Sequence, residues 1–126
     1  MGHTDKLLLA DAFFPAEKYA KRGIPVIRAD GIGGVELLDA ILALLPLESS
    51  YTDTPVTLYA PPPEFQVETP IWEEYKKIVA KHDERGASAV KAVPKKDFLS
   101  ACDDAFAMIQ TGETALFGLV MLEKGL

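Results

Sequence analysis

Short apolar runs that end at polar or turn residues recur along the chain, and each of them predicts a β-strand. Most positions within the runs are apolar, which is typical of strands buried on both faces of a sheet. The predicted strands are Lys6–Asp11, Pro25–Arg28, Thr54–Ala60, Ser88–Val93 and Leu116–Leu122. Helical segments separate most of these strands. This alternation predicts a compact α/β domain in which helices cover a parallel or mixed sheet.

Apolar residues at helical spacing predict three helices between the strands. They are Val35–Leu45, a segment that begins at Thr69-Pro70 and is closed by Gly86, and Asp97–Gln110. Proline is favoured at the first turn of a helix, which supports the start of the second one. In the third helix, Phe98, Cys102, Phe106 and Ile109 are expected to face inward, so Cys102 is interpreted as a buried structural thiol.

Length and charge limit the classes of function. The 126 residues suffice for one domain, residues 1–126, with a substantial core. The net charge of −6 disfavours a nucleic acid or an anionic membrane as partner, but is compatible with a neutral ligand. The single cysteine, Cys102, cannot form a disulfide within the chain and favours a reducing compartment. No signal-peptide pattern is recognisable, and Glu36, Asp39 and Pro46 interrupt the longest apolar run, so no membrane-spanning segment is expected.

Two side chains suited to proton transfer flank the first predicted strand, with His3 before it and Asp11 after it. Histidine exchanges protons near neutral pH, and aspartate is its usual partner. Since a strand rises about 3.3 Å per residue, both groups lie near the ends of one rigid element. Asp11 also stands where open α/β sheets bind ligands. The pattern alone leaves simpler roles open, a solvated His3 and an Asp11 that caps a turn.

Other motifs argue against two kinds of site. The glycines at 31, 33 and 34 do not match a dinucleotide-binding motif, because position 36 is Glu, and no phosphate-binding loop is present. His82 has no second His or Cys at metal-ligand spacing, so no metal site is predicted and an exposed His82 is expected. Arg28 and Asp30 fit a structural turn.

The motifs Gly2-His3-Thr4-Asp5, Asp11-Ala12-Phe13-Phe14-Pro15 and Ile27-Arg28-Ala29-Asp30-Gly31 closely resemble those of the D-ribose pyranase / L-fucose mutarotase family, the L-fucose mutarotase branch in particular. The resemblance covers almost the whole chain. It implies that His3 is the proton donor and that Asp11 binds the sugar. Family members carry a helix before the first motif, and this chain begins at the motif itself.

The same resemblance identifies three departures among the implied sugar contacts. Lys95 stands where the fucose branch has Arg, and lysine lacks the planar fork of a guanidinium. In the segment Thr111–Gly125, Phe117 replaces a Tyr and Leu119 replaces an Asn. These two changes remove a hydroxyl and an amide that hydrogen-bond to the sugar.

What the resemblance implies is a cytoplasmic isomerase of carbohydrate metabolism that interconverts the anomers of L-fucose or a similar free monosaccharide. It implies no cofactor. It further implies self-association into a ring-shaped homo-oligomer, a homodecamer in known relatives, with the sugar site near a subunit boundary. The alternative is a non-catalytic sugar-binding or structural ring subunit of the same family, which the replacements Phe117 and Leu119 favour.

Overall fold

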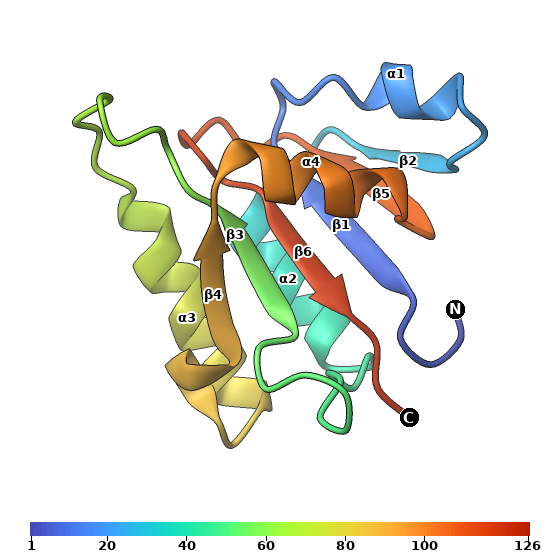
Figure 1. Ribbon diagram of the computed structural model, residues 1–126, viewed down its shortest axis with the longest axis vertical. Coiled ribbons are helices and arrows are strands. Elements are labelled where there is room, and N and C mark those ends of the chain that lie inside the picture. Colours follow the sequence, from blue (N-terminus) through green and yellow to red (C-terminus); the bar gives the residue numbers. More distant parts are fainter.

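The computed structural model describes all residues, Met1–Leu126, as one α/β domain built on a six-stranded sheet (Figure 1). The strand order is β2-β5-β1-β6-β3-β4. Only β6 runs antiparallel to its neighbours, β1 and β3, so the sheet is mixed. The strands are β1 (Lys6–Ala10), β2 (Val26–Ala29), β3 (Val56–Tyr59), β4 (Val90–Val93), β5 (Ala107–Thr111) and β6 (Val120–Glu123).

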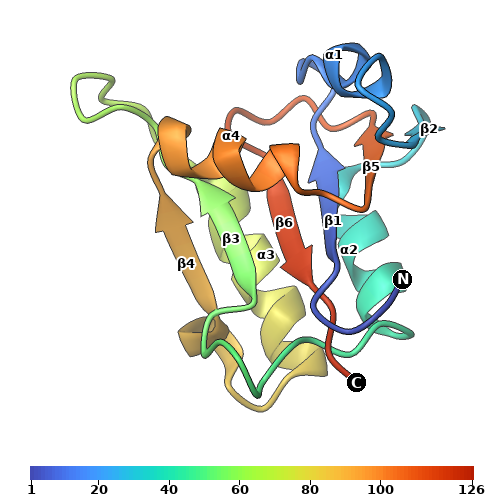
Figure 2. The ribbon, with the colours of Figure 1, turned by 45° about the vertical axis from the view of Figure 1, so that its right-hand side comes forward.

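Helices cover both faces of this sheet (Figures 1 and 2). One face packs against α2 (Gly34–Leu42) and α3 (Pro70–His82), and the other against α1 (Ala16–Ala20) and α4 (Lys95–Asp103). A short 3₁₀ helix, Gly86–Ala89, leads into β4. Side chains of β1 alternate between the two cores, as a strand period of two requires. Leu7 and Leu9 face α2 and α3, whereas Leu8 and Ala10 face α1 and α4.

The predicted α/β class, single compact domain and mixed sheet are confirmed, but the predicted helix Asp97–Gln110 is wrong. The helix α4 ends at Asp103, and the chain then forms β5, which pairs in parallel with both β1 and β2. Phe106 is 48% exposed instead of facing inward. Asp103 and Asp104 give the helix an acidic C-terminal end, which opposes its dipole. Strand pairing on both sides then decides the conformation of the following apolar residues.

Smaller differences concern element boundaries. The last predicted strand, Leu116–Leu122, begins only at Val120, and the residues before it form a turn. The strand predicted over Ser88–Val93 begins at Val90, after the 3₁₀ helix. The five-residue helix α1 was not predicted, because it is too short to show a helical period. None of the helices is long and apolar enough to cross a membrane.

Both ends of the chain lie close together at one end of the sheet (Figure 1). The backbone N–H of Thr4 donates to the carbonyl of Lys124 at 2.8 Å, and the N–H of Lys124 donates to the carbonyl of Asp5 at 2.9 Å. The N–H of Gly2 donates to a carboxylate oxygen of Asp5 at 2.6 Å. These bonds hold the turn that carries His3 against the end of β6.

Candidate functional site

The carboxyl ends of three parallel strands meet the amino end of β6 at one edge of the sheet. Asp11 follows β1, Tyr59 ends β3, Lys95 follows β4 and Leu119 precedes β6. These four side chains line a cavity of about 510 Å³. Open α/β sheets bind ligands at this edge, because loops that leave neighbouring strands diverge there and leave a crevice.

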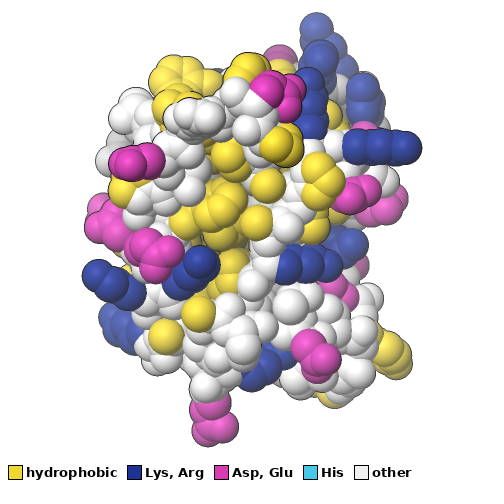
Figure 3. All heavy atoms as spheres, turned by 60° about the vertical axis from the view of Figure 1, so that its left-hand side comes forward, with side chains coloured by type: hydrophobic (Ala, Val, Ile, Leu, Met, Phe, Trp, Pro, Cys, Tyr) yellow, Lys and Arg dark blue, Asp and Glu magenta, His cyan; other side chains and the backbone are white.

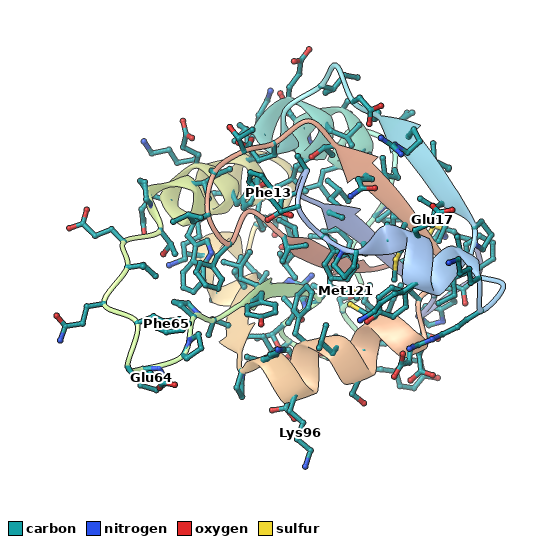
Figure 4. All side chains as sticks on the ribbon, turned by 90° about the horizontal axis from the view of Figure 1, so that it is seen from above. Phe13, Glu17, Glu64, Phe65, Lys96 and Met121 are labelled. Atoms are coloured by element: carbon teal, nitrogen blue, oxygen red, sulfur yellow. The ribbon has the colours of Figure 1, made fainter.

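Four residues singled out in the sequence line this one cavity, namely Asp11, Lys95, Phe117 and Leu119. Most of the remaining wall is apolar. It consists of Phe13, Phe14, Pro15, Tyr19, Tyr59, Leu99 and Leu116, with Lys18 as a second basic residue. Seen from above, Phe13 lies near the middle of this edge, whereas Phe65 lies far out on the loop after β3 (Figure 4). The cavity therefore combines one carboxyl group and two lysines with a largely apolar, aromatic wall.

Apart from Phe117, the aromatic side chains of the wall were not predicted as ligand contacts from the sequence. Tyr59 ends a strand that was predicted, so its place at the carboxyl edge was a usable signal. Its ring lies 5.3 Å from that of Phe98 and 5.5 Å from that of Phe117, centroid to centroid.

On the side of the molecule that carries the loop after β3, apolar side chains gather in the middle of the surface, and charged ones surround them (Figure 3).

Asp11 is the buried acid of the cavity, with 6% of its surface exposed. The backbone N–H of Phe13 donates to Oδ1 at 3.1 Å and fixes the orientation of the carboxyl group. Burial raises the pKa of Asp11; the nearby backbone N–H groups of Phe13 and Phe14 oppose that rise, and the charge of Glu113 adds to it. The other oxygen, Oδ2, makes no hydrogen bond within the chain, so it can accept one from a ligand hydroxyl.

Two side chains of α3 hold the turn that contains Phe117 in place. Phe117 has a φ of 56°, in the left-handed region that non-glycine residues rarely occupy. Trp72 donates its indole N–H to the carbonyl of Phe117 at 3.1 Å, and the Tyr75 hydroxyl donates to the carbonyl of Gly118 at 2.8 Å. Two side chains of one helix thus anchor consecutive carbonyls and set the position of the Phe117 ring.

The start of this segment is fixed by Glu113 and Gly112. The Glu113 carboxylate accepts the N–H of Gly34, at the start of α2, and the N–H of Ala115, each at 3.0 Å. A Cβ on Gly112 would lie 2.1 Å from the carbonyl oxygen of Asp30, so this position requires glycine. The predicted sugar-contact residues Phe117 and Leu119 therefore lie in a segment with little freedom to move.

His3 lies at the opposite edge of the sheet from this cavity. It precedes β1, whereas Asp11 follows it, and β1 alone spans about 13 Å at about 3.3 Å per residue. His3 Nε2 pairs with Oε2 of Glu48, and its ring lies 5.4 Å from the ring of Tyr51. A group that transfers a proton must come within about 3 Å of the reacting atom. Within one chain, His3 and Asp11 therefore do not share a ligand.

The model of the RbsD / FucU transport protein family matches residues 1–126. The chain belongs to this family. It is 41% identical to the fucose mutarotase of Homo sapiens over 131 residues, which covers 99% of this chain and 81% of the human protein.

Solved structures of RbsD / FucU proteins share the fold. FucU from Bifidobacterium longum superposes with a TM-score of 0.94 and 42% identity, covering 100% of this chain and 87% of that one. The fucose mutarotase of Streptococcus pneumoniae, solved in complex with L-fucose, superposes with a TM-score of 0.89 and 33% identity, covering 100% and 86%. The predicted resemblance to this family is thus confirmed.

Four other residues considered in the sequence have structural roles in this RbsD / FucU chain. His82 was expected to be exposed, but only 19% of its side chain is, and its Nε2 lies 2.6 Å from Oδ1 of Asp39 on α2. Arg28 and Asp30 form a bidentate pair at 3.0 and 3.1 Å on the surface. Cys102 is fully buried, which raises the pKa of its thiol to about 12 and keeps it protonated.

Proposed function

We propose that this protein is a mutarotase that interconverts the anomers of L-fucose or a closely similar free sugar. The observation that carries the proposal is the cavity in which a buried carboxyl group, Asp11, faces a wall of aromatic and aliphatic side chains. A monosaccharide presents hydroxyls and an apolar face, and L-fucose also carries a methyl group. The named relatives are fucose mutarotases, one of them solved with L-fucose.

The reaction needs one base and one acid and no cofactor. The base removes the proton from the anomeric hydroxyl. The C1–O1 bond becomes a carbonyl as the bond between C1 and the ring oxygen breaks, and the ring oxygen takes up a proton. Rotation about the C1–C2 bond and closure on the other face of the carbonyl give the second anomer. Positioned acid–base groups accelerate such steps by roughly 10²- to 10⁴-fold.

Within the cavity, Asp11 binds and orients a sugar hydroxyl through its unpaired oxygen. Tyr59, Phe117 and Leu119 contact the apolar face of the sugar, and Lys95 donates a hydrogen bond from the rim. Since Phe117 and Leu119 offer no side-chain hydrogen bond, hydroxyls that face them remain solvated by water or lose a partner.

His3 supplies the proton-transfer group from a neighbouring subunit. Its own chain holds it at the far edge of the sheet from Asp11, so a shared site needs a partner copy that brings the two edges together. In a closed ring every subunit boundary is the same heterologous contact, in which one surface of a subunit meets a different surface of the next subunit. A homodecameric ring in the cytoplasm is the assembly that we propose.

Exchange NMR on L-fucose tests the activity directly, because it measures anomer interconversion at equilibrium. We expect the protein to accelerate this exchange, and D-ribose serves as the comparison sugar. The change His3→Ala should abolish the acceleration and leave the fold and assembly intact. Light scattering should give a mass of several subunits. A protein that is monomeric at micromolar concentration would contradict the shared site.

The alternative of a non-catalytic ring subunit predicts a different result from the same experiment. Such a subunit would bind L-fucose, as seen by chemical-shift changes of the protein, without accelerating the exchange. The names of the relatives favour the mutarotase, and Asp11 in the cavity is compatible with either.

A further inference from the structure

Tyr59 is the last residue of β3, and its side chain lies on the face of the sheet that α1 and α4 cover. Val56 and Leu58 belong to the core beneath α2 and α3, whereas Tyr59 packs against the core on the other side. Because β3 pairs with β4 on one side and with β6 on the other, the backbone that carries Tyr59 is held in place. The strand therefore fixes where Tyr59 meets the cavity that it lines.

Two aromatic rings hold the ring of Tyr59. The ring of Phe98, which is fully buried on α4, lies 5.3 Å away, and the ring of Phe117 lies 5.5 Å away. Both pairs are tilted, by 56° and 43°, and aromatic rings prefer such arrangements to face-to-face stacking. Phe117 is itself anchored by the indole N–H of Trp72, which donates to its carbonyl. Since both neighbours are fixed, the hydroxyl of Tyr59 has a defined position.

The hydroxyl of Tyr59 makes no hydrogen bond within the chain, unlike that of Tyr75, which donates to the carbonyl of Gly118. It is not among the unpartnered polar atoms that are sealed from solvent. Burial raises the pKa of Tyr59, so the hydroxyl stays protonated at neutral pH and can both donate and accept a hydrogen bond. This hydroxyl is therefore available to a ligand in the cavity.

The other neutral hydroxyl of the cavity wall belongs to Tyr19, and it lies in a different environment. The guanidinium of Arg22 lies over the Tyr19 ring at 5.1 Å, and the charges of Asp103 and Arg22 act on the Tyr19 hydroxyl. That hydroxyl therefore lies near the end of α4. The side chain of Phe117 has no polar group. Of the two neutral hydroxyls of the wall, the one beside Phe117 is that of Tyr59.

We propose that Tyr59 is a specificity-determining residue of the cavity, and that its hydroxyl forms a hydrogen bond with one hydroxyl of the sugar on the side of Phe117. This inference rests on the proposed function, in which the cavity holds the sugar. The ring of Tyr59 contacts the apolar face of the sugar, and the hydroxyl at its end adds a polar contact. A sugar hydroxyl that reaches Tyr59 keeps a protein partner, whereas one that faces Phe117 alone depends on water.

Such a hydrogen bond discriminates between sugars that differ at one carbon atom. A phenol hydroxyl at the end of a ring packed between aromatic side chains has lost part of its water. A sugar that presents no hydroxyl to it leaves this group unpaired in the cavity, and an unpaired polar group is costly. Deoxy sugars and epimers that fill the same space are therefore bound more weakly than the sugar whose hydroxyl reaches Tyr59.

The change Tyr59→Phe tests the inference because it removes only the hydroxyl. Dissociation constants of L-fucose and of four analogues, each lacking the hydroxyl at C1, C2, C3 or C4, are measured from chemical-shift changes of the protein. We expect Tyr59→Phe to bind L-fucose about three- to tenfold more weakly than the unmodified protein does. The analogue that lacks the partnered hydroxyl should bind both proteins equally. The other three should lose the same factor as L-fucose.

Thr57→Val is the matched control. Thr57 lies two residues earlier on the same strand and outside the cavity, so the loss of its hydroxyl should leave the binding of all five sugars unchanged. The melting temperature of sugar-free Tyr59→Phe should not fall, because the hydroxyl that is removed has no partner in the fold. A lower melting temperature would mean that the hydroxyl serves the fold, which contradicts the inference.

The binding results separate this inference from the proposed function. Equal losses for L-fucose and all four analogues would mean that Tyr59→Phe alters the shape of the cavity, and would overturn the hydrogen bond. Unchanged binding of L-fucose by Tyr59→Phe also overturns the inference, while accelerated exchange by the unmodified protein still supports the proposed function. An unmodified protein that neither binds L-fucose nor accelerates its exchange overturns both.

Discussion

His3 and Asp11 flank the same five-residue strand from opposite ends, and neither can reach the ligand of the other within one chain. Each is nevertheless held in place by its own network. Asp11 is oriented by the backbone of Phe13, and His3 is held by Glu48. Two ordered groups at opposite ends of the strand are what a site divided between subunits requires.

The double change Phe117→Tyr with Leu119→Asn should strengthen L-fucose binding and raise activity. Both residues line the cavity, and both lack the hydrogen-bonding groups of the fucose branch. A sugar hydroxyl without a partner costs roughly 1–3 kcal/mol, or about ten- to a hundredfold in affinity. Titration of L-fucose and exchange NMR measure both effects, and Phe106→Tyr, outside the cavity, is the control. If the unmodified protein is already efficient and the double change does nothing, these positions do not contact the sugar.

Asp11→Asn should stabilise the protein at neutral pH. The change should also weaken the binding of the sugar more than it slows the reaction of the bound sugar. Because burial raises the pKa of Asp11 above 3.8, the folded state binds more protons than the unfolded state between the two pKa values. The unmodified protein therefore loses stability as pH rises through this window, whereas the variant does not.

Thermal unfolding at pH 7 and near pH 3 checks this stability prediction. The melting temperature of Asp11→Asn should exceed that of the unmodified protein at pH 7, and the difference should shrink at acid pH. Added L-fucose should raise the melting temperature of the unmodified protein more than that of the variant. A variant that is less stable at both pH values would contradict the assigned effect of burial.

Thr4→Gly should stabilise the protein by about 1 kcal/mol. Thr4 has a φ of 71°, and a β-branched residue is strained in the left-handed region, whereas glycine is not. Thr4→Ala removes the hydroxyl but keeps a Cβ, so it should give no comparable gain. Denaturant unfolding of the three proteins measures the difference. Equal stabilities of the glycine and alanine variants would show that backbone strain at Thr4 is absent.

Tyr75→Phe should destabilise the fold by about 1–2 kcal/mol and weaken sugar binding. Its buried hydroxyl donates to the carbonyl of Gly118, and the change leaves that carbonyl without this partner next to Phe117. Tyr51→Phe is the matched control, since the Tyr51 side chain is 75% exposed and its hydroxyl makes no hydrogen bond in the chain. Denaturant unfolding and L-fucose titration give the two readouts. Unchanged sugar binding would mean that the turn does not depend on this anchor.

Most strands could be predicted from the sequence because an apolar run with turn residues at both ends is a local signal. β5 could not, since the apolar positions from Phe98 to Ile109 keep a helical spacing across the end of α4. Pairing with β1 and β2, which are distant in the sequence, decides its conformation. The local pattern carries no information about that pairing.

The candidate site likewise has a part that could be predicted from the sequence and a part that could not. Asp11 and Lys95 follow predicted strands, so their meeting at the carboxyl edge follows from the topology. Glu48 lies in a polar segment with no motif, and its contact with His3 joins residues 45 positions apart in the chain. No periodicity or spacing indicates that contact, so only the three-dimensional structure reveals it.

A mixing experiment tests the central claim, that His3 of one subunit acts on the sugar held by Asp11 of another. At L-fucose concentrations well below KM, His3→Ala should be inactive in exchange NMR, and Asp11→Asn should be nearly inactive because it binds the sugar weakly. Co-assembled in equal amounts, they should regain roughly a quarter of the unmodified activity, because random assembly around a symmetric ring restores both groups at that share of boundaries. Mixed rings that remain as inactive as the separate variants would contradict the shared site.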